Sequence, residues 1–285
     1  MEEEKAQHEG ELWGRVFSCE NLRAALERVR QNKGVPGVDG MTAEELPGHL
    51  RAHWPSIRTK LETGKYRPSP VKRVEIPKPG GGQRKLGIPT VLDRMIQQAL
   101  QQVLSDEFEE TFSDHSYGFR PGRSAHDAVE AARGYIEAGK SWVVDIDMEK
   151  FFDTVNHDRL MARMKTVVAD KRVLRLVNEY LKAGVMEGGV VVASEEGTPQ
   201  GGPLSPLLAN IVLSELDEKL EERGHSFVRY ADDCNIFVKS ERAAKRVMES
   251  TSRFIEGRMR LKVNVSKSAI GLAVKRQFLG FSYYY

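Results

Sequence analysis

The chain has 285 residues, 40% of them hydrophobic and 29% charged, a composition that supports a buried core and excludes a disordered protein. Its 43 Lys and Arg against 41 Asp and Glu give a formal net charge of +2, and its two cysteines, Cys19 and Cys234, exclude a disulfide scaffold or a cysteine-rich zinc module. The acidic N-terminus has no apolar signal segment, and no apolar run approaches the ~20 residues that span a bilayer. We therefore expect a soluble protein of a reducing compartment, with one large or two small domains.

Apolar residues at helical spacing, together with helix-capping residues, predict helices along most of the chain. Thr42 followed three residues later by Glu45 has the pattern of a capping box, and Ser124 is a capping residue before another helical stretch. The expected helices cover residues 22–29, 42–61, 90–108, 124–136, 159–164, 173–181, 204–220 and 243–254.

Strand patterns are fewer. One of them alternates so that Asp145 and Asp147 lie on one face and Val144, Ile146 and Met148 on the other. The expected strands cover residues 71–76, 84–88, 142–148, 190–194, 226–230, 235–239 and 278–284, and the first two form a hairpin with a glycine-rich tip. Helices mixed with hairpins favour the α+β class, with helices packed on one face of a mainly antiparallel sheet.

The near-neutral total charge hides a basic block. Residues 51–90 contain ten Lys and Arg but only two Asp and Glu, a local charge of +8 that leaves −6 for the rest of the chain. Such a block is often only a solvated face. The alternative is a polyanionic partner, because phosphate binding depends on clustered cations rather than on net charge.

Two acidic clusters stand where strands run into turns. The first lies within residues 145–153, with the sequence DIDMEKFFD, and the second is Asp232–Asp233 at the tip of an otherwise apolar hairpin. Adjacent carboxylates repel one another, so they are either solvated turn residues or ligands that share a divalent cation.

The segment Tyr230-Ala231-Asp232-Asp233 resembles the palm signature of reverse transcriptases, and other motifs follow in the order of that family. These motifs are GVDG at 37–40, SYGFRPGRS at 116–124, GTPQGGPLSP at 197–206 and FLGF at 278–281. From about residue 21 to 281 the chain resembles the bacterial group II intron-encoded reverse transcriptases, or maturases. The resemblance implies a cytoplasmic, bacterial RNA-directed DNA polymerase that also binds intron RNA.

The same resemblance implies the fingers and palm of a right-hand polymerase. It assigns residues 1–20 to an N-terminal extension, 21–140 to the fingers and 141–285 to the palm, with interleaving near 91–140 and 170–205. The chain ends four residues after Phe281, where full-length relatives continue into a helical thumb. With the thumb absent, we expect chemical competence but weak duplex binding and low processivity.

Polymerisation in this family implies two divalent cations, Mg²⁺ with Mn²⁺ as a possible substitute, held by carboxylates from separate strands. The resemblance assigns Asp147, Asp232 and Asp233 as catalytic metal ligands and adds the Met148 carbonyl. Asp145 lies on the same strand face as Asp147, so geometry alone leaves it as an alternative, although the family spacing to the double phenylalanine favours Asp147.

The implied nucleotide-binding residues are Lys78, Arg84, Phe152, Gln200 and Lys267. Lys78 and Arg84 match the cations that grip the triphosphate, and Phe152 matches the gate under the incoming sugar that rejects a 2′-hydroxyl. Phe151 and Phe152 are alternatively core residues, and alternation along a strand places one of them in the core. For Lys267 the alternative is a solvated lysine after a strand.

The implied template- and primer-binding residues are Arg120, Arg123, Tyr230 and Gly201. Helix capping and a salt bridge are the alternative for the two arginines, and the favoured one for Arg123. No metal is assigned to the three histidines whose spacing we considered, because they show no ligand spacing with another His or Cys. They are His126, His157 and His225.

The expected partners are intron RNA, an RNA template, a DNA or RNA primer and deoxynucleoside triphosphates, with no membrane and a possible homodimer through the palm. One alternative function is an RNA-binding splicing cofactor without independent polymerase activity. Another is a defence-associated reverse transcriptase. A nuclease also uses an Asp–metal cluster, but it does not need Gln200, the aromatic gate Phe152 and the triphosphate-binding Lys78 together.

Overall fold

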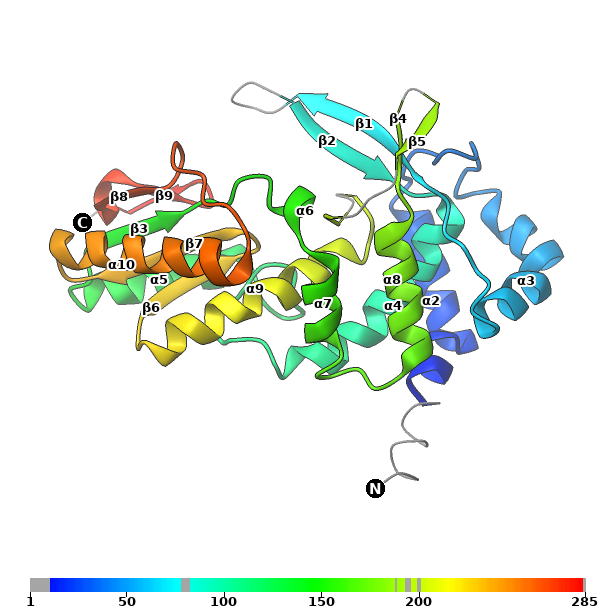
Figure 1. The fold of residues 1–285 in the computed structure, drawn as a ribbon, viewed down its shortest axis with the longest axis horizontal. Coiled ribbons are helices and arrows are strands. Elements are labelled where there is room, and N and C mark those ends of the chain that lie inside the picture. Colours follow the sequence, from blue (N-terminus) through cyan, green and yellow to red (C-terminus); the bar gives the residue numbers. More distant parts are fainter. Residues whose placement is uncertain (1–10, 78–82, 188, 193–195, 199–200, 284–285) are drawn as a thin grey trace. The chain divides into compact units, whose positions relative to one another are not determined.

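The computed structural model describes residues 11–77, 83–187, 189–192, 196–198 and 201–283. The chain divides into two compact units, each built from two segments (Figure 1). The first unit comprises Met1–Phe108 and Val155–Leu208, and the second comprises Glu109–Thr154 and Ala209–Tyr285. The predicted boundary between residues 140 and 141 falls inside the second unit, just before a strand of its sheet.

Helices form most of the first unit. Residues 11–16 are helical, and they are followed by α2 (Cys19–Gln31), α3 (Leu46–Glu62), α4 (Val91–Glu109), α7 (His157–Met164) and α8 (Lys171–Lys182). Helix α4 is buried on nearly all sides, with 12 of its 19 residues inaccessible, as expected for a central helix. Helix α8 buries a single apolar face, and the carboxylate of Asp170 caps its N-terminus.

The sheet of the first unit has the strand order β2-β1-β4-β5. The predicted hairpin is confirmed: β1 (Val71–Pro77) pairs antiparallel with β2 (Gln83–Ile88), Lys72 opposite Ile88. Strand β4 (Val185–Glu187) lies parallel to β1, and β5 (Val190–Val192) returns antiparallel to β4. Strand β4 was not predicted, because three residues are too few to show an alternating pattern.

The second unit contains an antiparallel sheet with the order β6-β7-β3-β8. Its strands are β6 (Ser226–Tyr230), β7 (Asp233–Val238), β3 (Trp142–Ile146) and β8 (Ala269–Leu272). The apolar side chains of β3, β6 and β7 fill the core on both faces. Together with its helices, this sheet confirms the predicted α+β class.

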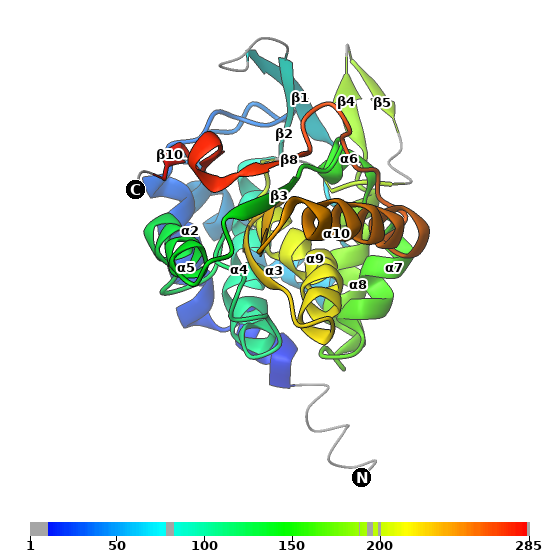
Figure 2. The ribbon, with the colours of Figure 1, turned by 90° about the vertical axis from the view of Figure 1, so that its left-hand side faces the viewer.

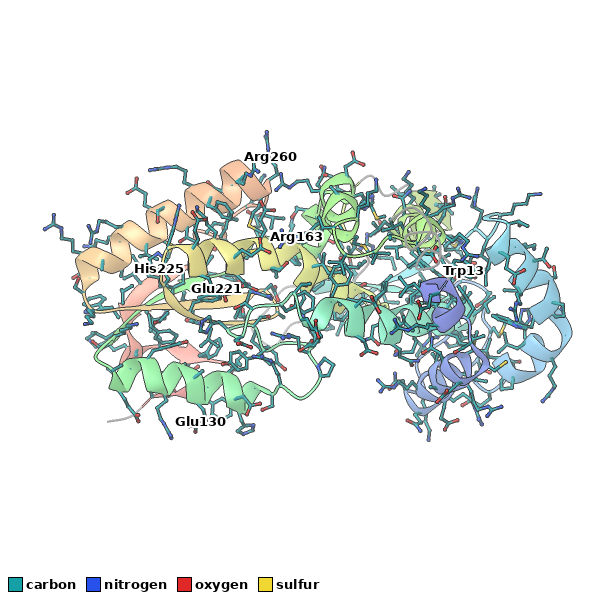
Figure 3. All side chains as sticks on the ribbon, turned by 90° about the horizontal axis from the view of Figure 1, so that it is seen from below. Trp13, Glu130, Arg163, Glu221, His225 and Arg260 are labelled. Atoms are coloured by element: carbon teal, nitrogen blue, oxygen red, sulfur yellow. The ribbon has the colours of Figure 1, made fainter. Side chains whose placement is uncertain are left out.

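Helices cover both faces of this sheet, not one as expected (Figures 2 and 3). Helix α5 (Ala125–Glu137), which carries Glu130, packs against Val143, Val228 and Phe237 on one face. Helices α9 (Ser205–Glu222) and α10 (Glu241–Phe254) lie on the other side. By alternation along β3, Asp145 lies on the same face as Val143, toward the end of the strand.

Two predicted strands are shorter than expected. Strand β3 ends at Ile146, and after a left-handed Lys150 the chain forms the short helix α6 (Phe151–Thr154). The stretch predicted as a strand at 278–284 is split into β9 (Gln277–Phe278) and β10 (Phe281–Ser282), because the two residues between them have positive φ. A π-helical turn, Ile255–Met259, follows α10, and the 3₁₀ turn Ala273–Lys275 follows β8. Among the described residues, no helix is long and apolar enough to cross a membrane.

Candidate active site

Two turns that carry carboxylates meet at one end of the second unit's sheet. Strands β6 and β7 pair as far as Tyr230 and Asp233, so only Ala231 and Asp232 form the turn between them. Strand β3 pairs with β7 up to Ile146 opposite Cys234, and the next pair in this register is Asp147 and Asp233. The sheet therefore brings together the three aspartates that the sequence predicted as metal ligands.

The backbone of Asp147 is fixed by the turn before β8. Its N–H donates to Ser268 Oγ at 3.0 Å, and its carbonyl accepts from the Asn264 N–H at 2.9 Å. The ammonium of Lys267 lies 3.7 Å from Asp147 Oδ2. A predicted nucleotide-binding lysine thus pairs with a predicted metal ligand.

Asp145 has a different partner. Arg276 Nη2 donates to Asp145 Oδ2 at 2.6 Å, and both side chains are more than two-thirds buried. Burial raises the pKa of Asp145 despite this arginine. Asp145 thus has a closer cationic partner, at 2.6 Å, than Asp147 has in Lys267 at 3.7 Å, and the choice of Asp147 as the ligand stays a prediction.

Burial and the neighbouring carboxylates both act on the ionisation of Asp233. Loss of hydration, together with the charges of Asp232, Asp145 and Asp147, raises the pKa of Asp233 to about 6, although the residue remains open to solvent at the start of β7. Lys267 opposes this effect. A cluster of this kind gains stability from a bound cation, which removes the repulsion.

The donor set fits a hard divalent cation such as Mg²⁺ or Mn²⁺, since its atoms are carboxylate and carbonyl oxygens. Met148 forms an isolated bridge with Val263 in which the flanking residues make the hydrogen bonds, so the bridge does not use the Met148 carbonyl. Within the described ranges, no three acidic, His or Cys side chains are oriented to hold a metal ion. Lys267 supplies the positive charge next to Asp147 instead.

Comparison with known proteins identifies the family. The reverse transcriptase (RNA-dependent DNA polymerase) family matches residues 76–283. The chain belongs to the reverse transcriptase family. The protein YkfC of Escherichia coli K12 is 34% identical over 90% of this chain and 77% of its own length. The group II intron-encoded protein LtrA of Lactococcus lactis is 37% identical over 68% of this chain, which spans 32% of LtrA.

A solved structure agrees at the level of the fold. A chain of a partial Cas6-RT-Cas1–Cas2 complex, 24% identical, superposes with a TM-score of 0.52 over 85% of this chain and 42% of its own. The predicted kinship with group II intron reverse transcriptases and maturases is therefore confirmed, and so is the polymerase fold class. Reverse transcriptases generally use divalent metal ions, in line with the oxygen donors at this site.

Phe152, the predicted sugar gate, and its neighbour Phe151 are both buried. Phe151 and Phe152 are 2% and 8% exposed and meet edge to face, with ring centroids 5.2 Å apart. The premise that one of them points out of a strand was wrong, because both lie in α6. The role of Phe152 as a sugar gate stays a prediction.

Of the predicted nucleotide- and primer-binding residues, Arg84 and Gly201 belong to the first unit. Lys78 and Gln200 fall outside the described residues, and of Arg84 the structure describes only its place in β2. Gly201 has φ +120°, and a Cβ there would stand 2.8 Å from the carbonyl oxygen of Gly87. A glycine is therefore required at 201 by close approach to β2, independently of any nucleic acid.

His157, to which the sequence assigned no metal, holds the segment that precedes Gln200. It is buried, and its Nε2 donates to the Gly197 carbonyl at 2.7 Å, while the Gly197 N–H donates to the Val155 carbonyl at 2.8 Å. The motif GTPQGG is thus anchored at its first residue to the start of α7. A lone histidine at a helix start gave no signal of this contact.

The predicted template-binding arginines form internal ion pairs. The Arg120 side chain is 3% exposed and donates to Glu109 and to the Ser113 and Ser116 carbonyls, in line with the salt-bridge alternative, and its template contact stays a prediction. Arg123 pairs with Asp114 at 2.6 Å, which is the salt-bridge alternative.

Tyr230, the remaining residue predicted to touch the template or primer, is half-buried. It packs at the edge of the apolar cluster beneath α5. Its predicted contact with template or primer is untested.

Proposed function

We propose that this chain catalyses RNA-templated DNA synthesis. The observation that supports the proposal is the convergence of Asp147, Asp232 and Asp233 on two adjoining turns, within a chain of the reverse transcriptase family. The primer 3′-oxygen would lose its proton and bond to the α-phosphorus of a deoxynucleoside triphosphate. The bond from that phosphorus to the bridging oxygen would break, releasing pyrophosphate.

The chain's own residues would hold and orient the reactants. The three aspartates, with the Met148 carbonyl, would hold two Mg²⁺ ions or Mn²⁺ in their place. Bound cations stabilise the attacking oxygen and the leaving pyrophosphate. Lys267, whose ammonium lies beside Asp147, would then be free to face the phosphates, because a bound cation would take over the neutralisation of Asp147.

Asp145 on β3 and Asp147, just beyond the end of that strand, provide the sharpest test. In Mg²⁺-dependent primer extension on an RNA template, we expect Asp147→Asn and Asp233→Ala each to lose more than about 100-fold in rate. Asp145→Asn, two residues away and paired with Arg276, is expected to stay within about 10-fold of the wild type. Wild-type chain that makes no RNA-dependent product, or aspartate variants that extend normally, would refute the proposal.

Binding of intron RNA is a second function that the basic block supports. Four of its cations are exposed and have no acidic partner among the described residues, namely Arg51, Lys60, Lys65 and Lys72. We propose that they contact RNA phosphates in a bacterial cytoplasm, as part of a maturase role. The same cations would serve an RNA-binding cofactor without polymerase activity, so loss of the aspartates should leave RNA binding intact.

A further inference from the structure

A charged pair lies completely buried behind the catalytic turn. Arg229 on β6 is 0% exposed and its partner Asp217 on α9 is 1% exposed. They meet in two parallel bonds, Arg229 Nε to Asp217 Oδ1 at 2.7 Å and Nη2 to Oδ2 at 2.6 Å. Since neighbouring strand residues alternate, Arg229 points to the face opposite Tyr230 and Asp233.

Stability alone is a weak reason to keep such a pair. Removing two charges from water costs about as much as their attraction returns, and apolar residues of similar volume often serve equally well. Arg229 and Asp217 sit among apolar side chains of β6 and α9, where Phe227 and Leu216 are also fully buried. A specific geometric task is therefore the better explanation for the pair.

The remaining donors of Arg229 show what that task is. Nη1 donates to the Ala231 carbonyl at 2.8 Å and to Asn210 Oδ1 at 2.9 Å, and Nη2 also donates to Ser116 Oγ at 2.7 Å. All five N–H groups of the guanidinium are thus used. The Ala231 carbonyl belongs to the peptide that joins Ala231 to Asp232, so the arginine fixes the orientation of this peptide.

The backbone conformation at that peptide has to be stabilised by neighbouring groups. Ala231 has φ +57°, a left-handed conformation that costs free energy for a residue with a Cβ and persists where the surroundings impose it. The same partners tie a second segment to the turn: Asn210 Nδ2 donates to the Gly118 carbonyl at 2.8 Å, and the Tyr117 N–H donates to the Arg229 carbonyl at 2.8 Å.

We propose that the buried Arg229–Asp217 pair positions the Ala231–Asp232 turn so that Asp232 and Asp233 are held ready for divalent cations. Arg229 acts through the Ala231 carbonyl and is a positioning residue, not a ligand. Asp217 orients the guanidinium. The inference rests on the proposed function, because it assumes that the two aspartates bind metal.

The test measures metal binding and turn dynamics in the full chain, without relying on activity. Mn²⁺ binding is followed by electron paramagnetic resonance in wild type, Arg229→Lys, Asp217→Asn and Ser116→Ala. Lysine keeps the charge but cannot make five bonds in a plane. Leu216→Ala, which removes core volume beside Asp217, serves as the matched control for general destabilisation.

We expect Arg229→Lys to weaken Mn²⁺ binding by about 10-fold or more, Ser116→Ala to have a smaller effect, and Leu216→Ala to leave the affinity unchanged below its melting temperature. Hydrogen exchange should rise at residues 230–233 in Arg229→Lys but not at 142–146. If Arg229→Lys does not fold, Asp217→Asn and Ser116→Ala, which each disturb one hydrogen-bond partner of Arg229, are compared with the wild type in its place.

The outcomes distinguish failure of the positioning role of Arg229 from failure of the metal site. Equal Mn²⁺ affinity in wild type, Asp217→Asn, Ser116→Ala and any folded Arg229→Lys overturns the positioning role, and so does an equal loss in Leu216→Ala. Wild-type chain that binds no Mn²⁺ refutes the metal site itself and with it the proposed function, whereas hydrogen exchange still reports whether Arg229 holds the turn.

Discussion

At the scale of one residue, Asp233 is placed for chemistry at a cost in stability. Its carboxylate is less easily ionised in the folded chain than in the unfolded one, since its pKa rises from 3.8 to about 6 through lost hydration and neighbouring carboxylates. For an acid with a raised pKa, folding is penalised in the ionised state. Stability therefore falls as the pH rises between about 4 and 6, and the penalty is complete above that range.

The sign of this effect predicts that Asp233→Asn stabilises the metal-free chain. At pH 7.5 the gain should be about 1 kcal/mol, because solvent exposure of Asp233 screens the repulsion, and it should shrink toward zero as the pH falls toward 4. Calorimetric unfolding in the presence of a chelator measures it. Asp106→Asn, an exposed aspartate of α4, is the control. A gain that does not depend on pH would contradict the argument.

At the scale of elements, sequence patterns located the helices well because their signals are local. Ser124 caps the start of α5 as expected, where it forms a capping box with Asp127, and α4 follows its predicted range within one residue. Thr42 and Glu45 also bond as predicted, but α3 begins only at Leu46, since these bonds close a turn before the helix.

Short strands were missed where pairing, and not pattern, defines them. Strand β8 is held by its ladder to β3, and no alternation of apolar and polar residues marks it in the sequence. The fragments β9 and β10 are separated by Leu279 and Gly280, both at positive φ. These two residues interrupt the stretch that the sequence predicts as one strand.

The hairpin β6–β7 approaches the loop before α5 so closely that one side chain would disturb it. A Cβ on Gly118 would stand 2.4 Å from the Ala231 N and 3.0 Å from the Tyr230 carbonyl carbon, both backbone atoms. We expect Gly118→Ala to displace the turn, lower the free energy of unfolding by about 1 to 3 kcal/mol and reduce primer extension.

Gly134→Ala is the matched control for this prediction. Gly134 lies inside α5 with open space where a Cβ would be, so alanine there should stabilise the helix by up to about 1 kcal/mol. Thermal unfolding and extension rates of the two variants are compared side by side. An unchanged rate in Gly118→Ala would show that the turn tolerates displacement.

At the scale of the whole molecule, the carboxylates proposed as metal ligands could be located from the sequence, whereas the residues that support them could not. Asp232 and Asp233 are adjacent in a motif, and the family resemblance assigns Asp147 by its spacing to the double phenylalanine. Arg229 depends on Asp217 and Ser116, which lie 12 and 113 residues away. The only sequence feature that marked Arg229 was a charge inside an apolar strand, and this feature does not predict which residues Arg229 contacts.

The uneven charge of the molecule leads to a prediction about salt. If Arg51, Lys60, Lys65 and Lys72 contact phosphates, binding of a single-stranded RNA oligonucleotide weakens as salt increases, with a log–log slope of about −0.7 for each contact. Replacing all four by Gln should make that slope less negative by up to about 3 and lower the affinity. Filter binding or anisotropy over a salt series measures both quantities.

A variant with the same change in charge serves as the control. Replacing Arg242, Lys245, Arg246 and Arg253 on α10 by Gln also removes four exposed cations, but two of them, Lys245 and Arg253, are already paired with glutamates. If RNA binding depends on the block, this control should keep the wild-type slope more closely than the first variant does. Equal losses in both variants would mean that net charge, and not the 51–90 block, attracts the RNA.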